Sequence, residues 1–421
     1  MHFQTEALHA GYEKDTQSTM AVPIYMSTAY EFRDVEHAAD LFALKELGNI
    51  YTRLNNPTTD VFEKRFAALE GGEAALATSS GMSAIFYAIA NAAEAGDNIV
   101  CASQLYGGSL TLFSHSLKRF GIEARYFDVQ NPQEIETLID EKTKVIFFET
   151  LTNPSIDVAN IAAITAIANR HDILTVVDNT VATPALCRPF TYGVDIVVHS
   201  ASKYTTGQGL AIGGIMVERK GLVEKLRGNM RYEHFNEPDA SYHGLVYVDV
   251  PLPVYTLRAR LSLLRDLGAV SSPFNSWLFI QGLETLSLRM KEHSHNALRL
   301  AEYLENHPKV LTVNYPGLKS NQNYDNAQRY FTNGQASGLL SFVVSDYEQA
   351  KAIVDATELF SLVVNIGDSK SIITHPASTT HQQLSDDELV ACGVPAGLIR
   401  ISAGLENVAD LIADLQQALE A

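Results

Sequence analysis

The sequence predicts an α/β protein with a mostly parallel central sheet, helices on both faces of that sheet, and a smaller α/β domain at the C-terminus. Two observations support this fold class. Apolar runs of strand length alternate with helical patterns through the middle of the chain, as in successive β-α-β units. Reactive polar residues directly follow several of these runs, at the carboxyl edge of a parallel sheet where ligands bind.

The alternating elements can be assigned in order along the chain. A helical pattern over 82–93 follows a first apolar run. The predicted strands that come next span 98–102, 124–127, 144–148, 173–178 and 195–199. The predicted helices between them span 109–120, 133–139 and 160–171. Right-handed crossovers between parallel strands bring the carboxyl ends of those strands to one edge of the sheet.

Three regions are predicted from this pattern. Residues 1–54 lack the alternation and form an N-terminal arm, residues 55–272 form the domain with the reactive residues, and residues 273–421 form a C-terminal domain. A long helical pattern over 273–306 opens the last region. Its Glu-His-Ser-His run at 292–295 is interpreted as a polar face, because the spacing does not match a zinc site.

The rest of the C-terminal region has the pattern of a small mixed domain. Strands are expected at 339–344 and 399–402, and a final acidic helix with a solvated face is expected at 408–419. No internal repeat, low-complexity tract or long linker interrupts the chain.

Composition narrows the class of protein. The chain has 421 residues, of which 46% are hydrophobic, enough for a large buried core. Its 31 Lys and Arg against 49 Asp and Glu give a formal net charge of −18, which disfavours nucleic acid or an anionic membrane as a partner. Cys101, Cys187 and Cys392 have no disulfide or metal spacing, and the N-terminus lacks a signal pattern. A cytoplasmic protein without a metal site is therefore expected.

Lys203 and Asp178 are the most informative residues of the chain. Asp178 ends one apolar run, and Lys203 follows another in the segment VVHSASK. A lysine that bonds to an aldehyde, together with a carboxylate that keeps a pyridine nitrogen protonated, is what a pyridoxal-phosphate enzyme needs. Taken singly, each residue is more often a solvated strand end or a turn cap, so the interpretation depends on the residues around the pair.

A phosphate site is predicted near this pair. The turn ATSSGMSA at 77–84 leads from an apolar run into a helix, and the free N–H groups around Ser80, Gly81 and Met82 favour an anion. An ordinary capped connection is the simpler reading of the turn alone. Four other side chains have groups that suit a phosphate, namely those of Ser200, Ser202, Tyr51 and Arg53.

Seven short motifs run along nearly the whole chain. They are Tyr51-x-Arg53, Ser80-Gly81-Met82, Tyr106-Gly107, Asn153-Pro154, Asp178-Asn179-Thr180, Ser200-x-Ser202-Lys203 and Arg400-x-Ser402-x-Gly404-x-Glu406. In these motifs and in their order, the chain resembles the Cys/Met-metabolism family of fold-type I pyridoxal-phosphate enzymes. The resemblance implies a pyridoxal 5'-phosphate cofactor attached to Lys203.

The resemblance also implies roles for the other motif residues. Asp178 would hold the ring nitrogen, Tyr106 would stack on the ring and assist proton movement, and Arg400 would clamp the substrate carboxylate. Further cofactor-binding positions are Tyr51, Arg53, Ser80, Gly81, Met82, Asn153, Ser200 and Ser202, and further substrate-binding positions are Asn365 and Tyr51.

Within this family, several segments resemble those of the O-acetylhomoserine sulfhydrylases. These segments are 21–25, 235–244, 365–370 and 375–381. Gly108 stands where methionine γ-lyases have a cysteine, and Asn365 stands where many lyases and cystathionine synthases have a serine. Gln208 departs from the family, because a histidine is expected in that Gly-x-Gly turn.

The resemblance implies a γ-replacement in methionine biosynthesis, in which O-acetyl-L-homoserine and sulfide, or another thiol or sulfur donor, give L-homocysteine and acetate. A methionine γ-lyase or cystathionine γ-synthase reaction is the alternative, because it would use the same lysine, aspartate and arginine. The sequence leaves open the acyl group and the sulfur donor, which includes a sulfur-carrier protein. In this family Tyr51 and Arg53 grip the phosphate of a neighbouring subunit, which implies a homodimer at least and a homotetramer built from two dimers.

Two other classes of protein match part of the pattern. Ser200-x-x-Lys203 is also the signature of penicillin-binding enzymes, but the Ser-Asp-Asn and Lys-Thr-Gly motifs that accompany it are absent from the sequence. A non-catalytic binding protein on the same scaffold is disfavoured, because every cofactor position is filled. A visible absorption band that borohydride bleaches would distinguish the enzyme from both.

Overall fold

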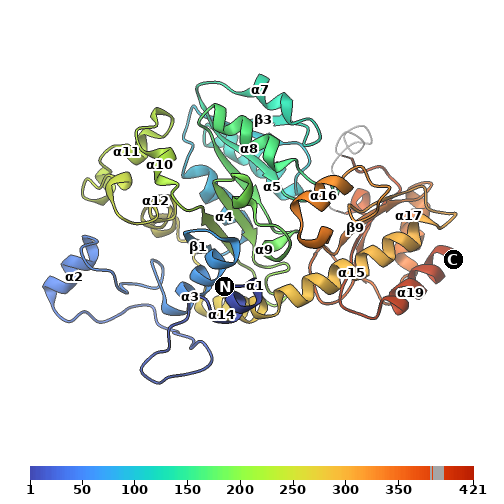
Figure 1. Ribbon diagram of the computed structural model, residues 1–421, viewed down its shortest axis with the longest axis horizontal. Helices are drawn as coiled ribbons and strands as arrows, with labels where there is room; N and C mark the ends of the chain where they lie inside the picture. Colours follow the sequence, from blue (N-terminus) through green and yellow to red (C-terminus); the bar gives the residue numbers. More distant parts are fainter. Residues whose placement is uncertain (380–381, 383–392) are drawn as a thin grey trace.

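A seven-stranded sheet forms the centre of the larger part of the computed structural model, which describes residues 1–379, 382 and 393–421 (Figure 1). The strands are β1 (Ala74–Thr78), β2 (Asn98–Ala102), β3 (Glu123–Phe127), β4 (Thr143–Glu149), β5 (Leu174–Asp178), β6 (Ile196–Ser200) and β7 (Gly214–Glu218). Their order is β1-β7-β6-β5-β4-β2-β3, and β3, β2, β4, β5 and β6 are parallel to one another. Only β7 runs against its neighbours β1 and β6. The predicted strands at 98–102, 124–127, 144–148, 173–178 and 195–199 are confirmed.

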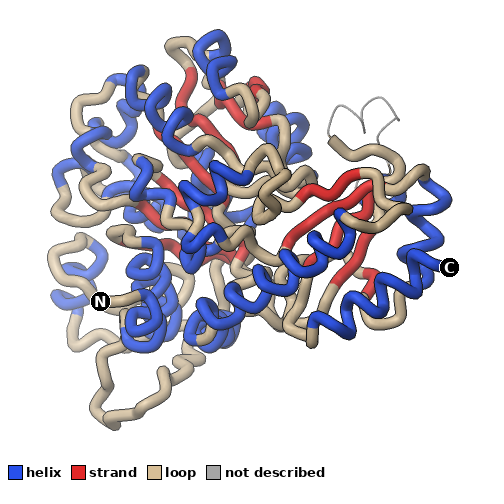
Figure 2. Tube along the Cα trace, turned by 45° about the vertical axis from the view of Figure 1, so that its right-hand side comes forward, coloured by secondary structure: helices blue, strands red, loops and turns tan. Residues whose placement is uncertain are grey.

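Helices lie on both sides of this sheet (Figure 2), which explains why its central strands are continuous apolar runs rather than alternating ones. The helices up to residue 272 are α1 (Phe3–His9), α2 (Val35–Phe42), α3 (Pro57–Glu70), α4 (Gly81–Ala90), α5 (Gly107–Thr111), α6 (Leu117–Arg119), α7 (Ile135–Leu138), α8 (Ile161–Arg170), α9 (Thr183–Leu186), α10 (Val223–Leu226), α11 (Glu233–Asn236), α12 (Val254–Arg258) and α13 (Arg265–Leu267). A π-helical turn, Leu112–Ser116, joins α5 to α6, so the helix predicted at 109–120 is present. The fold class predicted from the sequence is confirmed.

A second sheet lies in the C-terminal part of the chain. Its strands are β8 (Thr312–Asn314), β9 (Leu339–Val343), β10 (Ser361–Leu362), β11 (Ile372–Thr374) and β12 (Leu398–Ser402), in the order β10-β11-β12-β9-β8. The helices of this part are α14 (Pro273–Glu284), α15 (Leu286–Glu305), α16 (Tyr324–Tyr330), α17 (Tyr347–Ala356) and α19 (Val408–Glu420). The strands and the last helix predicted here are confirmed, whereas the boundaries at 54 and 272 stay predictions.

The single long helix predicted at 273–306 is wrong, because the chain breaks at Thr285 into α14 and α15. The break lets α14 pack against α3 while α15 packs against β9 and α19. The predicted polar face at 292–295 is also wrong in part. His293 is fully buried, donates a hydrogen bond of 2.7 Å from Nδ1 to the Ala403 carbonyl, and packs against the Tyr204 ring.

The first part of the N-terminal arm packs on the rest of the protein, whereas the part after α1 is largely exposed. Helix α1 packs on α3 and α14, and Glu6 in it forms an ion pair with Arg188 at 3.1 Å. The chain after α1, including α2, extends away from the large sheet (Figure 1). Several apolar side chains there are exposed, with Met20 at 85% and Met26 at 72% of their accessible surface.

No helix in the described part of the chain is both long enough and apolar enough to cross a bilayer. Cys392 and the end of the segment 375–381 lie outside the described residues.

Candidate active site

The site is a cavity of about 520 Å³ at the carboxyl ends of β4, β5 and β6. This is the edge of a parallel sheet at which ligands are expected to bind. The predicted site residues that line it are Ser80, Gly81, Met82, Tyr106, Asn153, Asp178, Ser200, Ser202, Lys203, Asn365 and Arg400. These residues come from both the large sheet and the small one, so the tertiary fold assembles them.

Lys203 presents a reactive amine to this cavity. Its Nζ donates a hydrogen bond of 2.6 Å to Oδ1 of Asn365, an uncharged partner. Burial lowers the pKa of the Lys203 amine, and the nearby Arg400 guanidinium lowers it further. A larger fraction of this amine is therefore neutral near pH 7 than in a free lysine, and a neutral amine can attack a carbonyl.

Asp178 and Glu149 end neighbouring parallel strands, where the sheet register pairs them directly. Asp178 accepts a hydrogen bond of 2.9 Å from the Thr180 N–H, and burial raises the pKa of the Asp178 carboxyl. Burial, and then the Asp178 charge, raise the pKa of Glu149 well above its usual range. No ion pair to either carboxylate occurs in the described part of the chain. A cation bound beside Asp178 would offset the free-energy cost of its charge, and a protonated pyridine ring would be such a cation.

Arg400, on β12, closes the opposite side of the cavity. Its Nη1 donates to Oδ1 of Asn153 at 2.9 Å, and its Nη2 donates to the Asn365 carbonyl at 3.2 Å. Burial lowers the pKa of this guanidinium to about 10, so it stays charged near neutral pH. Its buried Nε has no partner among the described residues. A substrate carboxylate would satisfy both the free donor and the charge.

The start of α4 forms a cradle for an anion. Ser80 caps the helix by accepting a hydrogen bond of 3.1 Å from the Ser83 N–H, as predicted for the turn at 77–84. A Cβ on Gly81 would lie 2.7 Å from Cβ of Ser200, so only glycine lets the helix start approach β6 this closely. The first N–H groups of the helix and the Ser200 hydroxyl consequently face one point, which fits a phosphate.

Tyr106 begins α5 at the mouth of the cavity, with 47% of its surface exposed. Its ring lies against Gly108, where an added Cβ would come within 2.5 Å of Cε1 of the ring. The absence of a side chain at Gly108 therefore lets the tyrosine ring take this position. Gln208, the departure noted in the Gly-x-Gly turn, is exposed between two glycines with positive φ.

Tyr51 and Arg53 do not reach the cavity of their own chain. Both are exposed on the N-terminal arm, and the Arg53 guanidinium lies near the Tyr51 ring at 5.6 Å and donates a hydrogen bond to the Arg265 carbonyl. The structure thus brings together every predicted site residue except these two.

Glu149 is the functional candidate that the sequence reading missed. A signal for it was present, because Glu149 follows the apolar run 144–148 in the same way that Asp178 follows its own run. Other residues of the cavity wall that were not predicted are Ile85, Thr111, Leu151, Val181, Ile212 and Val364. Most of these are apolar, and their sequence context is that of ordinary core residues.

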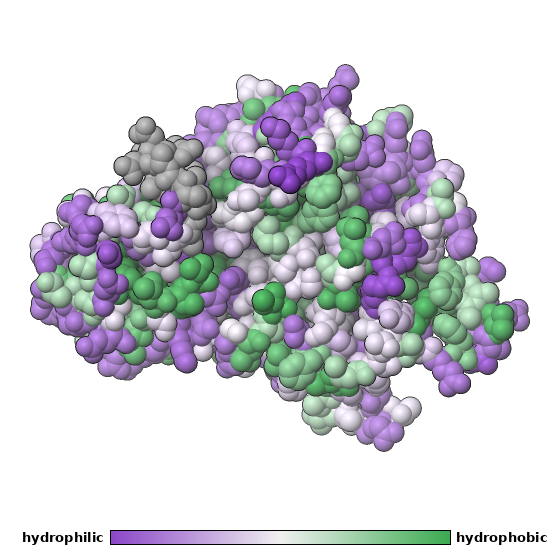
Figure 3. All heavy atoms as spheres, turned by 180° about the vertical axis from the view of Figure 1, so that it is seen from behind, coloured by the Kyte–Doolittle hydropathy of each residue, from purple (hydrophilic) through white to green (hydrophobic). Residues whose placement is uncertain are grey.

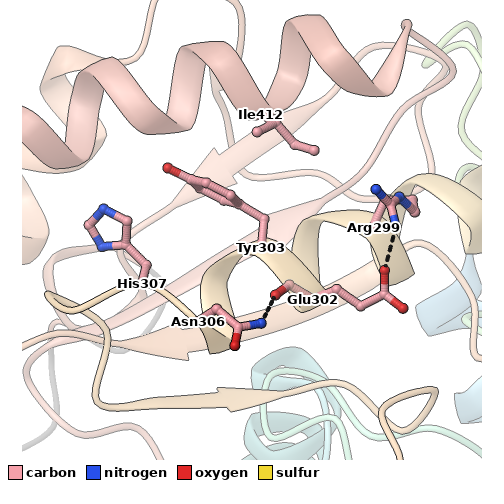
Figure 4. A pocket seen from close by; sticks show the side chains of 6 residues that line it. All are labelled: Arg299, Glu302, Tyr303, Asn306, His307 and Ile412. Carbon is pink, nitrogen blue, oxygen red and sulfur yellow. Dashed lines mark hydrogen bonds and ion pairs between the residues drawn. The ribbon is translucent and has the colours of Figure 1, made fainter.

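In a second cavity, several polar side chains that could bind a ligand already have partners within the protein. Figure 4 shows this cavity of about 330 Å³ between α15 and α19, where Arg299 already pairs with Glu302 at 2.8 Å and Asn306 bonds back to the same helix. Within the described residues, no group of three or more His, Cys, Asp or Glu side chains could hold a metal ion.

An amine with a lowered pKa, a carboxylate at a strand end, a helix start and an arginine line one cavity, and these are the groups that a pyridoxal-phosphate enzyme needs. The chain matches the family described as Cys/Met metabolism PLP-dependent enzyme over residues 4–420, and it belongs to that family. The family named from the sequence motifs and the cofactor expected from them are thereby confirmed.

Several relatives are similar over nearly their whole length. The O-acetyl-L-homoserine sulfhydrylase of Leptospira meyeri is 47% identical, with 99% of this chain and 96% of that protein covered. The homocysteine synthase of Schizosaccharomyces pombe is 45% identical, with 100% and 98% covered. A crystal structure from Campylobacter jejuni, which bears the name O-acetylhomoserine (thiol)-lyase and contains N'-pyridoxyl-lysine-5'-monophosphate, is 52% identical over 100% of both chains, with a TM-score of 0.99.

Proposed function

We propose that this enzyme replaces the acetoxy group on the γ carbon of O-acetyl-L-homoserine with sulfide, forming L-homocysteine and acetate in methionine biosynthesis. One observation carries the proposal: Lys203, Asp178 and Arg400 line one cavity in a chain whose full length matches relatives that bear this activity in their names. None of the relatives described above is named as a methionine γ-lyase or a cystathionine γ-synthase, so the alternative reaction has no support from them.

Pyridoxal phosphate, when bound, supplies an aldehyde that bonds to amines and a ring that accepts the electrons of a broken C–H bond. Lys203 is proposed as the residue that holds this aldehyde. Its free Nζ, whose pKa is lowered, would serve as the base that moves protons at the substrate carbons. Asn365 orients this nitrogen through its side-chain oxygen.

Arg400 is proposed to hold the substrate by its carboxylate. Two of its nitrogens are fixed by Asn153 and Asn365, which leaves the Nε edge free to receive an anion. A carboxylate held there fixes the rotation of the substrate, and thus decides which bond lies in line for cleavage. Asp178 would keep the ring nitrogen charged, and Tyr106, at the cavity mouth, would pack against the ring.

Identification of the products tests this proposal. The purified holoenzyme is incubated with O-acetyl-L-homoserine or O-succinyl-L-homoserine, each with sulfide, methanethiol or cysteine, and the amino acids formed are identified by mass spectrometry. Homocysteine and acetate from the acetyl ester and sulfide are expected to dominate. Release of 2-oxobutanoate from methionine without a thiol, at a comparable rate, would instead establish the lyase reaction. A protein-bound thiocarboxylate offered in place of sulfide tests the sulfur-carrier partner in the same assay.

We also propose a cytoplasmic homodimer in which Tyr51 and Arg53 serve the cavity of the neighbouring subunit, with two dimers forming a tetramer. Two features support the subunit arrangement. These residues are exposed and do not line their own cavity, and the arm that carries them has exposed apolar side chains. Apolar patches also occur among the polar residues on the face shown in Figure 3. Exposed apolar surface of this kind is typical of subunit contacts.

Mixing two inactive variants gives a prediction about this arrangement. Arg53→Ala and Lys203→Ala homodimers are each expected to be nearly inactive. After subunit exchange at equal amounts, about a quarter of the wild-type rate should return, since half of the dimers are hybrids with one intact site. No recovery after exchange, verified by mass spectrometry of the intact hybrids, would show that Arg53 acts within its own subunit. Light scattering of the wild type distinguishes the dimer from the tetramer.

A further inference from the structure

We propose that Glu149 is a positioning residue that holds Tyr106 and the Arg400 clamp in place relative to each other. The inference rests on the function proposed above, to which it adds a residue that determines how the substrate carboxylate is held. It concerns a buried carboxylate that the reaction itself does not use.

The two carboxylate oxygens of Glu149 bind two different loops. Oε1 accepts a hydrogen bond of 2.7 Å from the backbone N–H of Tyr106, which follows β2. Oε2 accepts a hydrogen bond of 3.1 Å from the backbone N–H of Asn153, which follows β4. The Glu149 side chain is 4% exposed, so its carboxylate is largely shielded from water. One rigid group therefore fixes the spacing of both loops.

The loop that carries Asn153 connects Glu149 to Arg400. Oδ1 of Asn153 accepts a hydrogen bond of 2.9 Å from Nη1 of Arg400. Arg400 in turn contacts Asn365, whose side chain binds Nζ of Lys203. The order of contacts is thus Tyr106, Glu149, Asn153 and Arg400, and it runs around one wall of the cavity.

The pattern of donors requires a carboxylate rather than a neutral group at this position. Each oxygen faces an N–H donor, so a protonated acid or an amide would place a hydrogen against one of them. The charged form is maintained at a cost, because burial and Asp178 both disfavour it while the two N–H groups favour it. A buried carboxylate at this position can hold both backbone N–H groups at once, whereas an amide has only one acceptor oxygen.

A pair of matched ligands tests the proposal on the holoenzyme. L-Norvaline has the amine and the carboxylate of the substrate without a leaving group, and n-butylamine is the same molecule without the carboxylate. Dissociation constants for both are measured from the change in the cofactor's visible spectrum. For Glu149→Gln, norvaline is expected to bind about tenfold more weakly, since a hydrogen bond to a charged group is lost and Arg400 shifts. Butylamine should bind within twofold of the wild type.

Glu218→Gln is the control variant. Glu218 is also a fully buried glutamate that accepts a backbone N–H, that of Thr256 at 2.7 Å, but it lies at the opposite end of the sheet from the cavity. Its replacement should lower the unfolding temperature without changing the ratio of the two dissociation constants. A purely structural role for Glu149 would produce that same result.

Two outcomes would overturn the proposal. One is an unchanged norvaline affinity in folded Glu149→Gln, and the other is an equal loss for norvaline and butylamine. If Glu149→Gln does not fold, Glu149→Asp keeps both acceptor oxygens, and the loss for norvaline should still exceed the loss for butylamine. Neither ligand reacts with sulfide, so the result does not depend on whether homocysteine is the product. Failure of the proposed function would leave this test intact.

Discussion

Lys203→Ala is expected to slow homocysteine formation by a factor of about 10⁴ or more, because the cofactor attachment point and the base that moves protons are lost together. The folded state should be retained. Nζ of Lys203 is held by an amide oxygen and not by a carboxylate, and it lies near the Arg400 charge. Removal of a partly buried cation without an anionic partner costs little stability.

Two further measurements make this prediction specific. After borohydride reduction and digestion, the wild type should have a pyridoxyl group on Lys203 and the variant should have none. Methylamine added to Lys203→Ala should restore part of the rate, whereas Lys203→Arg, whose side chain fills the space, should not respond. A Lys203→Ala enzyme with a near-normal rate would refute the proposed role of this residue.

Asp178→Asn is expected to lower the rate about a thousandfold, since an amide does not keep the ring nitrogen protonated while charge develops on the ring. The amide retains an oxygen for the Thr180 N–H, so the loop after β5 should keep its position. Steady-state kinetics of the holoenzyme, with saturating cofactor confirmed by absorbance, measure the loss. A decrease of less than tenfold would show that the ring nitrogen is not held by Asp178.

The same substitution is expected to stabilise the protein without cofactor. Burial raises the pKa of Asp178 in the folded state, so its contribution to stability is present at low pH and is lost as the pH rises through the folded-state pKa. The wild-type apoprotein should therefore lose stability as the pH rises above the usual range of an aspartate, and Asp178→Asn should lose less. At pH 8 the variant apoprotein should unfold at the higher temperature, and the holoenzyme should show the reverse order, because the cofactor ring then supplies the countercharge.

Asp195→Asn is the matched control for this result. Asp195 is buried as well, and more fully than Asp178, but Nε of Arg219 and Nζ of Lys225 contact it at 2.8 and 2.7 Å. Its replacement leaves two cations without their anion and should cost about 3 kcal/mol with or without cofactor. If Asp178→Asn destabilised the apoprotein as Asp195→Asn does, the two carboxylates at the ends of β4 and β5 would not destabilise the apoprotein by their burial and mutual repulsion.

The misread elements show where a sequence pattern stops being informative. The helix at 273–306 has a continuous helical pattern, yet the chain breaks at Thr285 because α14 and α15 pack on different partners. His293 looks like part of a polar face, but its ring is buried against Tyr204. In both cases distant parts of the chain override a local preference.

By itself, the sequence determined the parallel sheet, the attachment of reactive residues to strand ends and the cofactor class, because apolar runs and the polar residues that end them are local features. Only the tertiary structure decided which of those residues share a cavity. It places Asn365, from the loop between β10 and β11, against Lys203, and it brings Arg400 of β12 to the same cavity. It leaves Tyr51 and Arg53 outside, and it turns Glu149 inward beside Asp178. These relations join residues up to 247 positions apart, and they depend on the packing of whole elements, which no short stretch of sequence contains.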